Sequence, residues 1–177
     1  MYGSVWSLFS MKITNLHCRD ALCCHPKVKD KPTLQEKNQA CNFMVKSKTC
    51  EYYNNWQKES SGSRGASVSF GGEENPEGIL DIEDLVKTNS KRRVCPYYKS
   101  RDLAGRADLV FLPYNYILDP SVCRTLPVEF KDAFVLIDEA HNISQVSFAQ
   151  SVPQSMAVNS RSSDRISLWM AACQTEK

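Results

Sequence analysis

No stretch of the sequence approaches the ~18–20 consecutive apolar residues that cross a membrane. The first ten residues lack both the basic start and the sustained apolar run of a signal peptide. An excess of one charge is also missing, because 22 Lys and Arg face 20 Asp and Glu for a net charge of +2. This balance excludes a polycationic nucleic-acid tail, so any nucleic-acid contact has to be regional. We expect a soluble, intracellular protein of roughly one domain, with no membrane partner.

A Gly-Lys dipeptide is absent as well. The phosphate-binding loop G-x-x-x-x-G-K-[ST] requires that pair, because its backbone amides and its lysine hold the β- and γ-phosphates of a nucleotide. The sequence therefore lacks the phosphate cradle of a P-loop enzyme. If the chain contributes to a nucleotide site, we expect it to be a piece of something longer.

Cysteine, by contrast, is abundant, with eight residues in 177. Without a signal peptide, ligation of a metal or a cluster is favoured over a disulfide framework. No two cysteines form the C-x-x-C pair that most structural zinc sites use, so the spacing disfavours zinc. Four of the eight, Cys23, Cys41, Cys50 and Cys95, give the pattern C-x17-C-x8-C-x44-C.

Glycine is concentrated in one segment, since five of the seven glycines fall within residues 58–78 together with five serines. This composition buries too little apolar surface to offset the entropy of ordering, and it predicts a disordered surface loop. On either side, the sequence predicts helices over Gln35–Val45, Cys50–Gln57 and Ile79–Lys87.

The second half of the chain has an α/β character. Residues 108–113 and Ala133–Ile137 are short, continuous apolar runs, which are typical of strands in a parallel sheet buried on both faces. Tyr114–Leu118 follows the first run as an expected turn or helix that ends at Pro120. Residues 144–177 are rich in Ser and Gln and have little periodicity, so they receive no assignment.

Two acidic residues, Asp138 and Glu139, end the second apolar run and precede Ala140 and His141. An open parallel sheet places its chemistry at this carboxyl end of a strand. A nucleotide-hydrolysing site needs one carboxylate for Mg²⁺ and an adjacent one that orients the attacking water. The pattern therefore indicates a site for ATP and Mg²⁺, and the alternative is a solvated acidic turn.

A basic run surrounds Cys95, with no acidic residue between Lys87 and Arg101. Together with Tyr97 and Tyr98, it offers the cations and aromatic rings with which single-stranded DNA channels hold phosphates and stack bases. The alternative is a solvated charged face around two core tyrosines. The candidate DNA-binding residues are Lys91, Arg92, Arg93, Lys99 and Arg101.

Taken together, these segments resemble the iron–sulfur DNA helicases of the xeroderma-pigmentosum-group-D type. The resemblance runs from about Asn15 to Ile143, and order and spacing agree throughout. The matching segments are Arg19–Pro26, Ala40–Cys41, Cys50–Asn55, Ile79–Val86, Arg93–Tyr98, Ala107–Asp119 and Val135–Asn142.

The resemblance implies a small helical, Cys-rich [4Fe-4S] domain inserted into the first RecA-like motor domain, a P-loop fold of the α/β class. It implies Cys23, Cys41, Cys50 and Cys95 as cluster ligands, and the choice of Cys23 over Cys24 rests on the family pattern Cys-x-His-Pro. It also implies a DEAH box in which Asp138, Glu139 and His141 act on ATP. The implied activity is 5′ to 3′ unwinding of duplex DNA, bound at junctions with single strands, in DNA repair and telomere maintenance in the nucleus.

This reading divides the chain into an unassigned start (1–12), a cluster domain (13–106), a motor segment (107–143) and a tail (144–177) where an arch domain would begin. Because the phosphate cradle is absent, we expect the isolated chain to be inactive. A non-enzymatic iron–sulfur or zinc module that contacts DNA or a protein remains the alternative.

Overall fold

The computed structural model describes residues 11–62, 80–130 and 133–142. The chain consists of two compact units, residues 1–111 and residues 112–177. Among the described residues, no helix has the length and apolar character needed to span a membrane.

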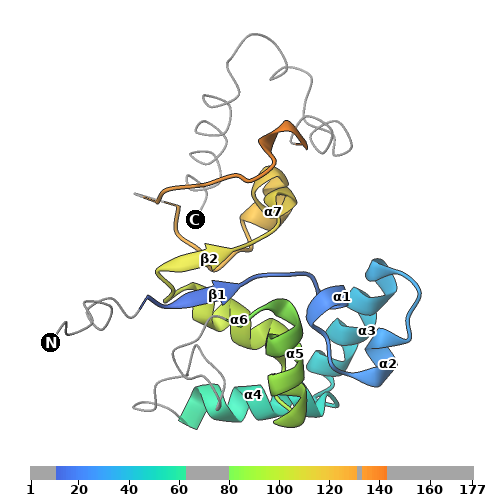
Figure 1. Ribbon diagram of the computed structural model, residues 1–177. Coiled ribbons are helices and arrows are strands. Elements are labelled where there is room, and N and C mark those ends of the chain that lie inside the picture. Colours follow the sequence, from blue (N-terminus) through green and yellow to red (C-terminus); the bar gives the residue numbers. More distant parts are fainter. Residues whose placement is uncertain (1–10, 63–79, 131–132, 143–177) are drawn as a thin grey trace, which may run out of the picture. The chain divides into compact units, whose positions relative to one another are not determined.

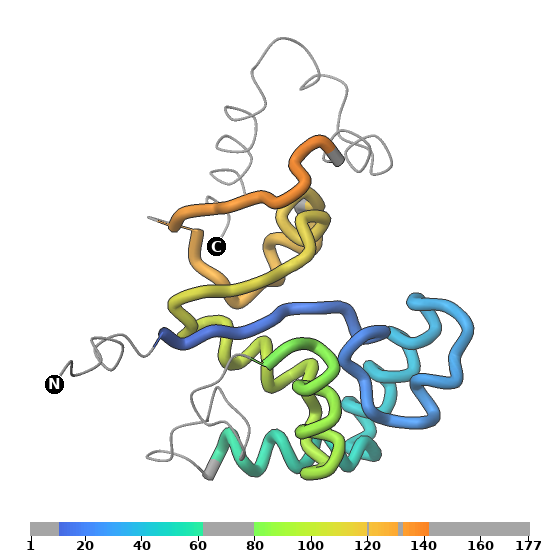
Figure 2. The backbone as a smooth tube through the Cα atoms, in the orientation of Figure 1, coloured from blue at the N-terminus to red at the C-terminus, as the bar shows by residue number. Residues whose placement is uncertain are grey.

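The two strands of a small parallel sheet are the first and the last described elements of the first unit (Figure 1). Strand β1 (Ile13–Asn15) pairs with β2 (Leu109–Phe111), with Ile13 opposite Leu109 and Asn15 opposite Phe111. Strand β2 confirms a strand within the run 108–113, but the strand is not buried on both faces, since Phe111 is 49% exposed. Strand β1 lies where the sequence predicted the start of the cluster domain. Residues 16–108 therefore form one long excursion between neighbouring strands, as the tube in Figure 2 makes plain.

Helices make up most of this excursion. Helices α1, α5 and α6 contact one another, α3 packs on α1 and α2, α4 packs on α6, and α6 also lies against β1. Their bounds are α1 Arg19–Leu22, α2 Pro26–Lys29, α3 Leu34–Lys46, α4 Glu51–Gly62, α5 Ile82–Lys91 and α6 Pro96–Ala104. The helices expected near 35–45, 50–57 and 79–87 are thus present as α3, α4 and α5.

Side-chain caps set two of these helix starts. The Thr33 hydroxyl accepts a hydrogen bond from the backbone N–H of Glu36 at 3.2 Å and donates one to the Glu36 carboxylate at 3.0 Å, so Thr33 caps α3. Asp81 accepts from the N–H of Asp84 at 2.7 Å and caps α5 in the same way. These caps explain why both helices begin within a few residues of the predicted positions.

The loop expected at 58–78 needs a correction at its start, because α4 continues to Gly62. Ser61 donates a hydrogen bond to the carbonyl of Gln57, and Glu59 pairs with Arg92 at 3.1 Å. These contacts hold the last turn of α4, which glycine and serine content alone did not predict. Residues 63–79 lie outside the described residues.

The core of the first unit gathers around α1 and α6. Among its most completely buried side chains are Leu22 at the end of α1, Leu103 on α6, and Leu16 just after β1. On α6, the buried face recurs every three to four residues, as helical geometry requires. The packing of α6 against both α1 and β1 holds the small sheet against the helices.

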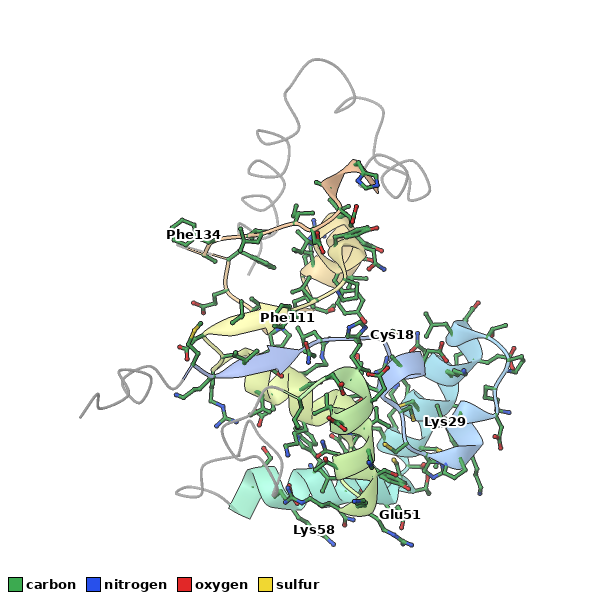
Figure 3. All side chains as sticks on the ribbon, in the orientation of Figure 1. Cys18, Lys29, Glu51, Lys58, Phe111 and Phe134 are labelled. Carbon is green, nitrogen blue, oxygen red and sulfur yellow. The ribbon has the colours of Figure 1, made fainter. Side chains whose placement is uncertain are left out.

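In the second unit, the predicted helix is confirmed as α7 (Tyr114–Leu118), and α8 (Pro120–Cys123) packs against it. The strand expected at Ala133–Ile137 is wrong for this structure, because the segment is extended but pairs with no described strand. Without a neighbour for its N–H and C=O groups, an apolar run cannot form a sheet. Phe134 and Leu136 are accordingly 99% and 94% exposed, and Figure 3 shows Phe134 projecting away from the chain.

Candidate functional site

Four cysteines far apart in the sequence meet at one pocket in the first unit. Each comes from a different element: one at the end of α1, one within α3, one directly before α4 and one capping α6. They are Cys23, Cys41, Cys50 and Cys95, the four that the sequence singled out, and each is 7–8% exposed. The seven described cysteines form no disulfide, so these thiols are available as ligands.

The four thiols influence one another electrostatically. Burial raises the pKa of the Cys95 thiol to about 12. The other three thiols raise this pKa further, whereas the backbone N–H of Tyr98 lowers it. Burial likewise raises the pKa of Cys23 to about 11, against the N–H of His25. Thiolates are the form that binds metal, so this site suits an occupant with enough positive charge to replace the protons.

Cys24 also lines this pocket, and it has partners outside the set of four cysteines. Its thiol donates to the carbonyls of Leu22 and Val86 at 3.8 and 3.7 Å. Burial raises the pKa of the Cys24 thiol, and Ser90 and Lys29 oppose this rise, while Cys24 in turn adds to the raised pKa of the neighbouring Cys23 thiol. Both thiols line the pocket, and Cys23, the more buried of the two, stays the predicted first ligand.

The spacing of the donors bears on the kind of metal site. Within the three described ranges, no three Cys, His, Asp or Glu side chains meet closely enough to hold one metal ion. Tetrahedral zinc binds sulfur at about 2.3 Å, so its four ligands crowd within roughly 4 Å of one another. In a [4Fe-4S] cluster each thiolate binds a different iron, so its four sulfur ligands stand farther apart than those of a single zinc ion.

Apolar and aromatic side chains enclose the pocket. Val28, Met44 and Val45 pack with Cys23 and Cys41, and the rings of Tyr53 and Tyr98 line the same space. Those two rings meet edge to face with centroids 4.7 Å apart, and Trp56 packs on both. This wall limits the access of water and oxidants to the thiols.

Arg19 ties α1 to the elements around the pocket, a role that sequence reasoning did not assign. Its guanidinium donates to the side-chain carbonyls of Asn38 and Asn42 on α3 at 3.2 and 3.1 Å, and it lies 4.4 Å from the ring centroid of Tyr97. The only sequence signal was its position at the start of the matching segment Arg19–Pro26, which also contains Cys23 and His25.

The candidate DNA-binding residues separate into two groups. Lys91, Arg92 and Arg93 are exposed at the end of α5, where Arg92 pairs with Glu59 at 3.1 Å and Arg93 with Glu51 at 3.0 Å. The half-buried Arg101 lies over the ring of Tyr97, 5.6 Å from its centroid.

Lys99 needs a correction, because it is only 4% exposed. It falls on the buried face of α6 with Pro96 and Leu103. Burial lowers its pKa, and the nearby Arg92 lowers it further. In this conformation Lys99 has no free ammonium to offer to a phosphate.

The acidic tetrapeptide lies in the second unit and is open to solvent. The backbone N–H of Glu139 donates to Oδ1 of Asp138 at 2.9 Å, and Oε2 of Glu139 lies 3.2 Å from Nδ1 of His141. Glu139 has a φ of 49°, an uncommon backbone conformation for a residue other than glycine. The turn brings the three polar side chains together, and residues of strained geometry cluster at functional sites.

Comparison with known proteins gives the class first: the DEAD_2 family model matches residues 4–160, and the chain belongs to that family. Among individual relatives, it is 42% identical over 135 residues to "Regulator of telomere elongation helicase 1" of Homo sapiens, which covers 76% of this chain and 10% of the relative. The Mus musculus protein of that name is 37% identical over 135 residues, again covering 76% of this chain and 10% of the relative. The homolog from Drosophila yakuba is 36% identical over 157 residues, covering 88% and 14%. The chain thus spans about a tenth of the length of the curated relatives it matches.

Proposed function

We propose that this chain is part of an ATP-dependent iron–sulfur DNA helicase of the nucleus, acting in DNA repair and telomere maintenance. The observation that carries the proposal is the convergence of Cys23, Cys41, Cys50 and Cys95, four buried thiols from separate elements, on one pocket. The relatives' printed name supports the helicase and telomere parts of the proposal.

In this proposal the four thiolates hold a [4Fe-4S] cluster, which joins four separate elements. The chain's own residues prepare the place. The N–H groups of His25 and Tyr98 face the sulfurs of Cys23 and Cys95, and the apolar wall keeps water out. Hydrogen bonds to sulfur and low solvent exposure are two of the means by which proteins set the potential of such clusters.

The catalytic part of the proposal assigns Asp138 to Mg²⁺ and Glu139 to the attacking water, with His141 beside Glu139. The two carboxylates belong to adjacent residues and are exposed, so they are accessible to a nucleotide that another part of the protein binds. The chain contains no Gly-Lys dipeptide, so the phosphate cradle has to come from elsewhere in a longer protein.

The first test is the metal content of the full 177-residue chain produced without oxygen. We expect brown protein with about four irons and four sulfides per chain, the composition of a Cys₄-bound [4Fe-4S] cluster. Colourless protein with one stoichiometric zinc would instead favour the second candidate, a non-enzymatic zinc module. The missing Gly-Lys dipeptide is the observation that keeps a non-enzymatic role open for the isolated chain.

We further propose that the exposed basic end of α5 contacts DNA phosphates. Changing Lys91, Arg92 and Arg93 together to Ala should weaken the binding of single-stranded DNA. It should also flatten the dependence of log K on log salt by about 2, since each lost phosphate contact removes ~0.7 from the slope. The ion pairs of Arg92 and Arg93 are exposed and weak, so they do not prevent such contacts. The measurement is fluorescence anisotropy of a labelled oligonucleotide at several salt concentrations.

A matched variant controls for net charge. Lys27, Lys31 and Lys46 are equally exposed and lie away from α5. Their joint replacement by Ala removes the same charge and should leave the slope nearly unchanged. Equal slopes for both triple variants would mean that the basic end of α5 is only a solvated face.

A further inference from the structure

His25 lines the pocket of the four cysteines, and its ring nitrogen Nδ1 is buried without a hydrogen-bond partner among the described residues. A buried polar nitrogen without a partner is unfavourable, and native structures nearly always supply one. An unpaired nitrogen at the wall of a pocket therefore indicates an acceptor or a donor on whatever occupies that pocket.

The position of the imidazole is fixed by the backbone on which it stands. His25 is the residue before α2, and its carbonyl accepts hydrogen bonds from the N–H groups of Val28 and Lys29, both at 3.0 Å. Its own N–H faces the sulfur of Cys23, and Pro26 restricts the chain on the other side.

A ring contact orients the side chain as well. The ring of Tyr52 meets the imidazole edge to face, with centroids 6.0 Å apart. The carbonyl of Tyr52 in turn accepts from the N–H of Cys95 at 3.0 Å. The imidazole thus follows the backbone of Cys23 in sequence and contacts Tyr52, whose carbonyl is hydrogen-bonded to the N–H of Cys95.

We infer that Nδ1–H of His25 donates a hydrogen bond to a sulfur atom of the cluster that the four cysteines hold. This inference rests on the cluster proposed above. The four thiols already supply one ligand for each iron, so the imidazole acts as a donor and not as a ligand. His25 is a positioning residue, and its hydrogen bond favours the more negatively charged, reduced cluster and raises its reduction potential.

The test is a dithionite titration of the full chain, loaded without oxygen and followed by the paramagnetic resonance of the reduced cluster. His25→Phe keeps a flat ring and removes the donor. We expect about a tenfold smaller ratio of reduced to oxidised cluster at a given applied potential, which equals about 59 mV for one electron. His25→Asn places an amide N–H near the position of Nδ1 and should restore most of the difference.

His17 provides the matched control, because it is half-buried and does not line the pocket. His17→Phe should leave the potential unchanged. A second readout needs no variant of His25: with histidine labelled by ¹⁵N, the reduced cluster of the unaltered chain should show nitrogen hyperfine coupling. That coupling should persist in His17→Phe.

The outcomes separate this inference from the proposed function. An unaltered chain that binds no iron and sulfide would overturn both. A loaded chain without nitrogen coupling would overturn the inference alone, as would a His25→Phe variant with the potential of the unaltered chain. If His25→Phe fails to load, the coupling measured on the unaltered chain decides.

Discussion

Cys23→Ser is expected to lower the iron content of the chain from about four per molecule to near zero, whereas Cys24→Ser should retain nearly all of it. The two residues are adjacent, so both variants make the same chemical change within one turn of chain. They differ in burial and hydrogen bonding, because Cys23 is 7% exposed and its sulfur faces the backbone N–H of His25, while the half-buried Cys24 thiol lies within hydrogen-bonding distance of two backbone carbonyls. Iron and sulfide analysis of anaerobically purified protein measures the difference.

Loss of the cluster should also loosen the fold around it. Without the proposed cluster, the elements that carry its ligands, α1, α3, α4 and α6, lose their shared attachment. We expect the Cys23→Ser variant to be digested faster by protease than Cys24→Ser. Cys123→Ser, at a buried cysteine of the second unit, provides a further control for the effect of serine itself. Equal iron in the Cys23 and Cys24 variants would contradict the assignment of Cys23 as a ligand.

Glu139→Gln is expected to slow ATP hydrolysis by about 10²–10⁴-fold in the full-length protein that contains this segment, with nucleotide binding retained. The amide keeps the shape of the side chain and loses the oxygen that orients and activates water. Phosphate release with and without single-stranded DNA measures turnover, and binding of a labelled nucleotide measures affinity. Near-normal turnover by this variant would remove Glu139 from its proposed role.

The isolated chain is the control for this experiment. Residues 1–177 should hydrolyse no measurable ATP, since Asp138 and Glu139 act only on a nucleotide that backbone amides and a lysine already hold. Robust DNA-stimulated activity from the chain by itself would mean that it carries a phosphate cradle of another kind.

The sequence predicted the elements whose signals are local. Helix α3 begins where the Thr33 side chain caps its first turn, and α5 begins where Asp81 does the same. The four cysteines were also found from the sequence, through their spacing and the family resemblance. In the structure these four cysteines line one pocket.

The elements that depend on distant partners were missed or wrong. Strand β1 is only three residues long, and its pairing with Leu109–Phe111 leaves no trace in its own composition. The apolar run at 133–137 has a strong strand pattern, yet no described strand lies beside it. Lys99 resembles its basic neighbours in the sequence, and only the orientation of α6 shows that it is buried.

The pairing of β1 with β2 has a consequence for chain connectivity. Neighbouring strands lie about 4.8 Å apart, so the chain leaves Asn15 and returns at Leu109 within roughly 10 Å of its exit. A crossover between adjacent parallel strands needs only about a dozen residues. Nearly all of residues 16–108 are therefore surplus to the connection. The connection itself thus leaves room for a change in the length of this excursion, as long as the packing of α6 on β1 is kept.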